Sequence, residues 1–271
     1  MTTLNLNDEL IMLEISGDDA TTYLQGQLTN DIRELANKPF QYSAHLNNKG
    51  RILASFIITS PCENTYYLIT SKTLVDKITP RLKMFILRSK VNLTLSSKFL
   101  SLSSTKIDAQ HSLELNTQYH LNIHDNPIAN SQIDSNTWHQ ALVELPFPMI
   151  YLDTLEKIIP QQVNFDLLGG INFKKGCYTG QEIVARTHYL GKIKRRMAKF
   201  TTQTQPQIGQ SVVSPIVENQ EVGFVVDFYQ ADKIYHGLVS VQNDCIENIY
   251  FDGENQNQLN CLALATDTQG K

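Results

Sequence analysis

The most unusual stretch of this sequence runs from Lys174 to Glu182 and reads KKGCYTGQE. Its cysteine lies between two glycines, and glycine allows left-handed backbone and the close approach of another group. The spacing of Gln181 to Arg186 predicts a helix directly after the second glycine. Cys177 then follows Lys175 and precedes a helix, and a cation and a helix N-terminus both favour the nucleophilic thiolate of a cysteine. The stretch therefore predicts a reactive thiol, with a buried structural cysteine in a glycine-bounded turn as the alternative.

The composition narrows the class of protein. The 271 residues include 23 Lys+Arg and 27 Asp+Glu, for a formal net charge of −4, and 41% are hydrophobic. Such a chain can bury a core, as one large domain or two to three small ones. Direct binding of bulk nucleic acid is not expected without a positive excess, although a local basic patch is compatible with this charge. No apolar run reaches the roughly 20 residues of a membrane span. Residues 1–9 contain no apolar signal core, so we expect a cytoplasmic protein without membrane association.

The cysteines do not predict a metal site. None of the four, Cys62, Cys177, Cys245 and Cys261, belongs to a C-x-x-C pair. In a reducing cytosol we expect free thiols.

Hydrophobic periodicity predicts an α+β protein with a β-rich C-terminal part. Alternation predicts strands over 9–16, 40–46, 51–60, 66–70 and 91–95, with a further strand hint near 121–123. Helical spacing predicts helices over 20–27, 71–87 and 138–145, with Pro80 interrupting the second. Residues 101–136 are otherwise polar and weakly periodic. Short alternating segments after 198 predict a separate all-β unit, with a boundary near 192–196.

Residues 175–182 resemble the K-G-C-[FY]-x-G-Q-E signature of the YgfZ family, folate-binding relatives of the glycine-cleavage T-protein. Mitochondrial iron–sulfur assembly factors share this signature. The resemblance extends to residues 17–31, to the turn 48–51 and to the lead-in 160–166, and it spans about residues 10 to 196.

The resemblance implies three modules around a central channel. Two α+β modules and a C-terminal β-barrel would surround a non-covalently bound tetrahydrofolate or derivative. We expect the first α+β module to comprise 1–45 and 125–192, the second 46–124, and the barrel 193–271.

The resemblance also implies a function. The chain would be a folate-binding accessory protein that supports the assembly or repair of iron–sulfur enzymes, including radical enzymes that act in tRNA processing, and these enzymes would be its partners. Cys177 corresponds to the functional thiol of the signature and Lys175 to its lysine. One cysteine cannot hold a cluster alone, so other ligands would come from a partner or a second copy.

The residues expected to bind folate lie in two regions. Tyr178, Gln181, Glu182 and Arg186 lie in or after the signature, whose backbone depends on Gly176 and Gly180. Trp138 would stack on the pterin, or it is an ordinary core tryptophan. The basic residues from 186 to 196 would grip the carboxylates of a folate or approach an RNA phosphate, or they form a solvated face.

The sequence does not decide whether the chain is an enzyme. T-proteins carry acids after the equivalent turn, where the run Gly50-Arg51-Ile52-Leu53-Ala54-Ser55 has Ala54 and Ser55 instead. Neither side chain can act as a general acid or base at neutral pH, which argues against aminomethyl transfer. Two alternatives stay open: a tetrahydrofolate-dependent one-carbon transferase or demethylase that uses another base, and an interaction module that has lost its ligand.

Overall fold

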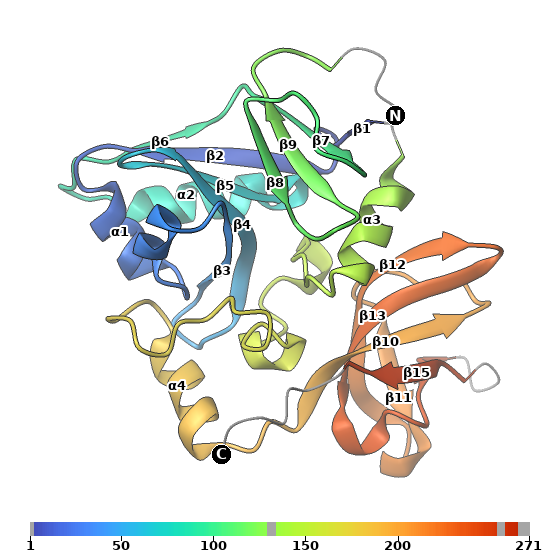
Figure 1. Cartoon of the computed structure of the whole chain (residues 1–271). Coiled ribbons are helices and arrows are strands. Elements are labelled where there is room, and N and C mark those ends of the chain that lie inside the picture. The colour runs from blue at the N-terminus through green and yellow to red at the C-terminus, as the bar shows by residue number, and fades with distance from the viewer. Residues whose placement is uncertain (1–2, 129–133, 254–257, 265–271) are drawn as a thin grey trace.

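The computed structural model describes residues 3–128, 134–253 and 258–264. These residues form three antiparallel sheets (Figure 1). Two sheets from the N-terminal half lie in the upper part of the view, and the third, formed by the C-terminal residues, lies at the right. No helix of the described residues is long and apolar enough to cross a membrane.

The first sheet contains the strands that the alternation predicted. Its described strands follow the order β3-β4-β5-β2-β6. They are β2 (Leu10–Ser16), β3 (Gln41–Leu46), β4 (Ile52–Cys62), β5 (Thr65–Ser71) and β6 (Asn92–Leu95). Their apolar side chains alternate between the two faces of the sheet, and most are buried because helices and chain segments pack on it.

A tight turn joins β3 to β4. The side-chain oxygen of Asn47 accepts hydrogen bonds from the backbone N–H groups of Lys49 and Arg51, at 2.9 and 3.0 Å. Gly50 closes the turn with a φ of +69°, a conformation that glycine adopts without strain. We refer to Asn47–Arg51 as the hairpin turn.

Two helices pack against this sheet: α1 (Ala20–Gln27) and α2 (Val75–Met84). Ile78 and Leu82 are the buried residues of α2. Pro80 lies inside α2 without ending it, and the predicted helix over 71–87 is shorter than expected because Lys72–Leu74 forms a 3₁₀ turn.

The second sheet has the order β1-β7-β9-β8 among the described residues. Its strands are β1 (Leu4–Asn5), β7 (Phe99–Ser103), β8 (His111–Glu114) and β9 (His120–His124). Only β9 was predicted. The other three are short. Strands β1 and β7 pair with strands distant in sequence, and β8 forms a short hairpin with β9, so pairing stabilises them more than their own alternation does.

The third sheet confirms the β-rich C-terminal part. Its described strands follow the order β14-β11-β12-β13-β10-β15. They are β10 (Arg195–Thr202), β11 (Ser211–Ser214), β12 (Gln220–Ala231), β13 (Ile234–Gln242), β14 (Tyr250–Phe251) and β15 (Asn260–Ala263). The sheet has an apolar cluster of its own, which includes Val225, Val239 and Phe251. Closure into a barrel stays a prediction.

Helices α3 (Ser135–Glu144) and α4 (Gln181–Leu190) complete the described helical structure, together with short 3₁₀ turns. The remaining 3₁₀ turns are Ile32–Ala36, Leu152–Thr154, Pro160–Val163, Pro215–Val217 and Asn243–Cys245. Helix α3 packs on β12 and so lies where the C-terminal sheet meets the rest of the chain (Figure 1).

The strand pairing does not follow the first two expected modules. The boundary expected at 45/46 falls at the end of β3, yet β3 pairs with β4 in one sheet because the hairpin turn joins them directly. The second sheet likewise pairs β1 with β7, which were assigned to different modules. How the chain divides into domains therefore stays a prediction, but the boundary within the N-terminal half cuts through two sheets.

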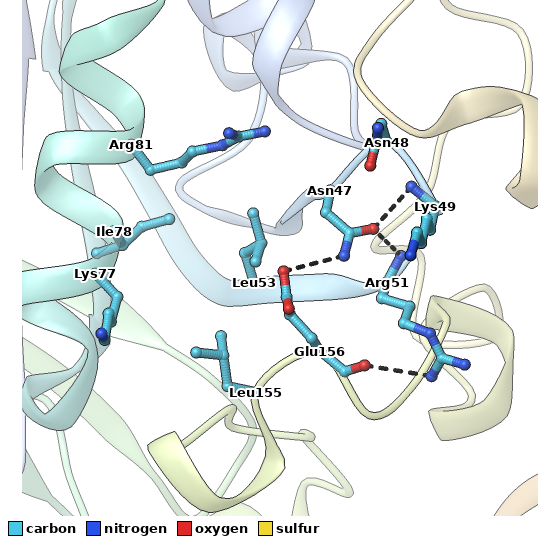
Figure 2. A pocket seen from close by; sticks show the side chains of 10 residues that line it. All are labelled: Asn47, Asn48, Lys49, Arg51, Leu53, Lys77, Ile78, Arg81, Leu155 and Glu156. Carbon is cyan, nitrogen blue, oxygen red and sulfur yellow. Dashed lines mark hydrogen bonds between the residues drawn. The ribbon is translucent and has the colours of Figure 1, made fainter.

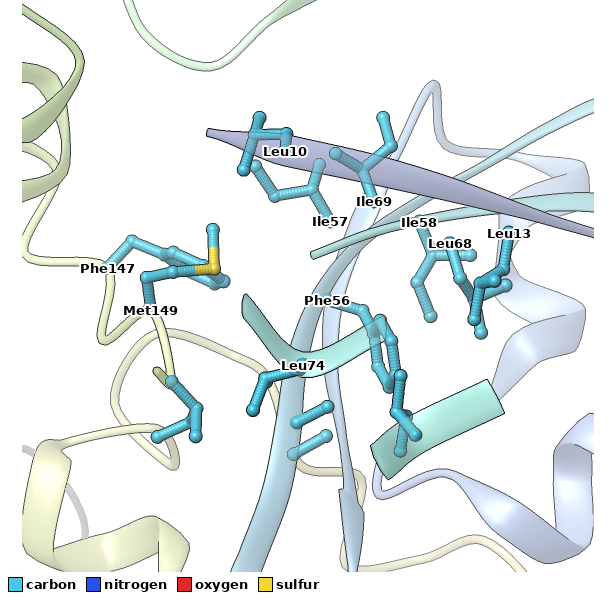
Figure 3. Close-up of a cluster of buried hydrophobic side chains, with 14 of the residues drawn as sticks. Leu10, Leu13, Phe56, Ile57, Ile58, Leu68, Ile69, Leu74, Phe147 and Met149 are labelled. Atoms are coloured by element: carbon cyan, nitrogen blue, oxygen red, sulfur yellow. The ribbon is translucent and has the colours of Figure 1, made fainter. Parts of the chain in front are cut away.

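The main core lies between the first sheet and the segments that cover it. Figure 3 shows Leu13, Phe56 and Leu68 of this sheet packed together, with Phe147 and Met149 lying beside β4. The segment that follows α3 thus packs directly against the first sheet.

Candidate functional site

The signature stretch forms a loop, residues 174–180, that leads into α4. Cys177 is exposed in this loop. The N–H of Thr179 donates to the carbonyl of Gly26 at 3.3 Å, and the N–H of Gln181 donates to the carbonyl of Tyr178 at 3.2 Å. The first bond ties the loop to the end of α1, so the thiol lies on a segment that is anchored to the body of the protein. Cys177 is therefore not the buried structural cysteine of the alternative interpretation.

The second glycine of the signature presses against the hairpin turn. Gly180 has a φ of +79°, and a Cβ atom there would lie 2.5 Å from the carbonyl oxygen of Asn47. Gly50 of the turn is equally confined, since a Cβ there would lie 2.7 Å from Cβ of Ile183 in α4. By contrast, a Cβ on Gly176 would meet nothing within 4 Å. Two segments 130 residues apart therefore meet backbone to backbone at Gly50 and Gly180.

The signature lysine is buried beneath the loop and is 6% exposed. Its ammonium donates to the carbonyls of Leu28, at 2.6 Å, and Asn30, at 2.9 Å, and lies 5.2 Å from the ring centre of Tyr178. Burial lowers the pKa of Lys175 to about 8. The hydrogen bonds of this cation run to the segment after α1, and its influence on the thiol of Cys177 stays a prediction. The influence of the helix N-terminus likewise stays a prediction, with Gly180 capping α4 three residues after Cys177.

Asn30 organises the segment that receives Lys175. Its side-chain amide donates to the carbonyls of Tyr42, at 2.9 Å, and Gly169, at 2.8 Å. Nearby, the hydroxyl of Thr29 donates to the carbonyl of Gly170 at 2.7 Å. These contacts join the end of α1, β3 and the chain ahead of the signature. The sequence signals for this role were the polar Thr-Asn pair between apolar segments and its place within the resemblance over residues 17–31.

The side chains of the other signature residues differ in how far they are exposed to solvent. Tyr178 is buried, and burial raises the pKa of its hydroxyl. On α4, Gln181 is half-buried, whereas Glu182 and Arg186 are exposed and one turn apart. Glu182 and Arg186 share a helix face because residues at i and i+4 project in the same direction.

Trp138 is not brought to these residues. It is 1% exposed on α3, the helix that packs on β12, and it is one of the largest fully buried side chains among the described residues. Its position supports the alternative of a core tryptophan.

Ala54 and Ser55 of β4 are fully buried. The hydroxyl oxygen of Ser55 accepts the N–H of Ile150 at 3.1 Å and lies 4.0 Å from the sulfur of Met149. The chain that follows α3 therefore occupies the space beside these positions.

A cavity of about 920 Å³ is lined by Gly26 of α1, the residue whose carbonyl accepts the N–H of Thr179 from the signature loop. Tyr23, Gln27 and Phe85 also line it. The side-chain oxygen of Gln27 is buried and has no hydrogen-bond partner among the described residues. A buried acceptor in this state favours a ligand that donates a hydrogen bond.

Comparison with curated proteins identifies the family. A tRNA-modifying protein YgfZ from Photobacterium profundum is 30% identical over 279 aligned residues, which cover 90% of this chain and 84% of the relative. The chain belongs to the YgfZ family. A YgfZ protein from Aliivibrio fischeri is 27% identical and is covered over 88% of its length. No protein-family model matches the chain, so membership in the YgfZ family rests on these relatives.

The fold is also that of an aminomethyltransferase. The crystal structure of glycine cleavage system aminomethyltransferase T from Bartonella henselae matches with a TM-score of 0.65, over 95% of this chain and 83% of that one, at 12% identity. The YgfZ-family chain thus has the T-protein-like combination of helices and sheets that the resemblance implied.

Proposed function

We propose that the chain is a folate-binding accessory protein that supports iron–sulfur enzymes, including enzymes that modify tRNA, with Cys177 as its functional thiol. Family membership supports the role in tRNA modification, because the relatives are named tRNA-modifying proteins. The T-protein-like fold supports the folate part, since the resemblance links both groups to folate. The arrangement of three modules around a channel belongs to this proposal.

The observation that carries the proposal is the exposed thiol of Cys177 on an anchored loop. Lys175 fixes the chain before the thiol by two hydrogen bonds, and Gly180 fixes the chain after it against the hairpin turn. An exposed thiol at a defined position suits a transient bond to an iron ion or to a sulfur atom of a partner protein. A single cysteine leaves the other positions of an iron for ligands from that partner.

The cavity lined by Gly26 of α1 has a size that suits a folate. Its volume of about 920 Å³ lies within the range of small-ligand sites. Tyr23 and Phe85 would face the flat pterin, and the unpaired side-chain oxygen of Gln27 would accept a hydrogen bond from it. Tyr178, Gln181, Glu182 and Arg186 remain proposed folate contacts on the signature side.

The thiol is tested in cells that lack their own YgfZ protein. Cys177→Ser should abolish restoration of a tRNA thiolation that depends on an iron–sulfur enzyme, while the purified variant unfolds at the same temperature as wild type. Cys62→Ser is the matched control, because Cys62 is also an exposed free cysteine. Full restoration by Cys177→Ser would contradict the proposal.

The folate site is tested by calorimetry with tetrahydrofolate and 5-formyl-tetrahydrofolate. We expect saturable binding that Gln27→Leu weakens at least tenfold. Emission from Trp138, the single tryptophan, should change little on binding because the residue is buried on α3. Saturable quenching of this emission would instead place the ligand at α3. An absence of binding heat up to millimolar ligand would contradict the folate part.

The likeness to an aminomethyltransferase favours a second candidate, a tetrahydrofolate-dependent one-carbon transferase or demethylase. The buried Ala54 and Ser55 supply no carboxylate for it. We expect no methylene-tetrahydrofolate above background when methylated amines and tetrahydrofolate are supplied. A product that forms in proportion to the protein would establish this candidate.

A further inference from the structure

A second cavity, of about 730 Å³, is lined in part by the hairpin turn. Figure 2 shows its three walls: the hairpin turn, α2, and the residues Leu155 and Glu156. Leu53, Ile78 and Leu155 give it an apolar floor. The hairpin turn thus contacts the signature loop at Gly180 and also lines this cavity.

Positively charged side chains outnumber negatively charged ones in the lining of this cavity. Four cations line it: Lys49 and Arg51 from the hairpin turn, and Lys77 and Arg81 from α2. Glu156 is its single carboxylate, and one oxygen of that carboxylate already accepts a hydrogen bond from the amide of Asn47 at 3.1 Å. Within the described part of the chain, none of the four cations forms an ion pair: the salt bridges there use other residues. The guanidinium of Arg51 donates to the backbone carbonyls of Glu156, at 3.3 Å, and Lys157, at 2.5 Å. Four cations without a carboxylate partner around one cavity repel each other and favour a negatively charged ligand.

Arg81 provides an independent observation. Its Nε atom is buried and has no hydrogen-bond partner among the described residues. Its guanidinium lies 4.9 Å from the ring centre of Phe85, which holds the side chain in place. In Figure 2 this side chain extends from α2 toward the hairpin turn. A buried donor without an acceptor destabilises the free protein, and an oxyanion beside it would supply the acceptor.

We infer that this cavity binds a small organic anion that carries two or more carboxylate or phosphate groups. Its volume fits a small molecule rather than a polymer. Lys49 and Lys77 are exposed and would act as point charges, and Arg81 would bind an oxyanion through its planar guanidinium. The apolar floor would receive the carbon part of the ligand. The inference goes beyond the proposed function, because none of these residues was assigned to folate or to the thiol.

The test is calorimetry at constant ionic strength with two probes, inorganic triphosphate and benzene-1,3,5-tricarboxylate. We expect one saturable site for at least one probe, and the probe that binds more tightly identifies the preferred oxyanion. The double variant Lys49→Gln/Lys77→Gln should weaken binding at least tenfold, and Arg81→Gln should do the same. Lys83→Gln is the matched control, since Lys83 is exposed on α2 but does not line the cavity.

The double variant changes only exposed side chains, so loss of fold does not confound it. Cys177→Ser should bind the probes as wild type does, which separates this inference from the proposed function. An absence of saturable heat with either probe up to about 10 mM, a concentration on the order of that needed to detect very weak sites, would overturn the inference. Equal binding by the wild type and the double variant would also overturn it.

Discussion

At the scale of single residues, the cysteines differ in their surroundings. Cys177 and Cys62 are exposed, whereas Cys245 is buried and Cys261 is partly buried. Burial raises the pKa of Cys261 to about 12. Because the thiolate is the nucleophile, exposure and pKa together decide which thiol reacts. An exposed cysteine next to a glycine in an anchored loop is therefore accessible to reagents and partners, whereas the buried cysteines are not.

We predict that iodoacetamide at pH 8 modifies Cys177 and Cys62 at least tenfold faster than Cys245 and Cys261 in the native protein, since the last two are shielded or protonated. Peptide mass spectrometry after timed quenching measures each rate. In denaturant all four should react. Protection of Cys177 in the native protein would show that the loop is not exposed as described.

At the scale of elements, the contact between the hairpin turn and the signature loop is the central feature. Gly50 and Gly180 both have positive φ, and each leaves no room for a Cβ atom. The turn contacts α4 through Ile183. It also forms one wall of the cavity that Lys49, Lys77 and Arg81 line. The signature glycine is therefore required by a tertiary contact as well as by its own backbone conformation.

Gly180→Ala should lower the free energy of unfolding by about 2 kcal/mol or more, because it combines a left-handed backbone with a close contact to the carbonyl of Asn47. Gly176→Ala is the control in the same motif: its Cβ meets nothing, and its φ is not positive. It should change stability by less than about 0.5 kcal/mol. Denaturant unfolding measures both, and equal effects would contradict the contact.

At the scale of the whole molecule, a buried polar cluster joins the C-terminal sheet to the rest of the chain. Asp227 of β12 is fully buried. Its carboxylate accepts a hydrogen bond from His139 of α3 at 2.6 Å and from the hydroxyl of Tyr151 at 2.8 Å. Burial lowers the pKa of His139, but the neighbouring carboxylate raises it more, and the net shift is upward from 6.5. The positive charge on His139 is thus linked to the packing of α3 on β12.

A histidine whose pKa is raised by folding stabilises the native state fully at pH below its unfolded value, and this stabilisation is lost as pH rises through the folded value. Asp227→Asn should therefore cost about 3 kcal/mol at pH 6, and the difference from wild type should narrow at pH 9. Asp244→Asn, at an exposed position, is the control. Thermal unfolding at both pH values tests this, and a cost that grows with pH would contradict the pairing.

Local pattern predicted much of the fold. The strands of the first sheet, the hairpin turn, α1, α4 and the β-rich C-terminal part follow from periodicity and turn residues, because these depend on neighbours in sequence. Strand β7 escaped prediction, since pairing with β1 and β9 stabilises it across long stretches of chain, and β8 is a short edge strand that pairs only with β9. The expected module boundary at 45/46 stays a prediction, although it separates the paired strands β3 and β4, because strand pairing is not visible in local pattern.

The candidate site likewise has features that local sequence predicts and features that depend on tertiary structure. The sequence alone determined the signature, its cysteine and the helix that follows, because these are consecutive residues. Only the tertiary structure decided that Lys175 turns to the carbonyls of Leu28 and Asn30 and that Trp138 is buried on α3. It alone brought Lys49 of the hairpin turn to Arg81 of α2 around one cavity. The side chain of a residue adopts the direction that its packed neighbours permit, and those neighbours come from remote parts of the chain.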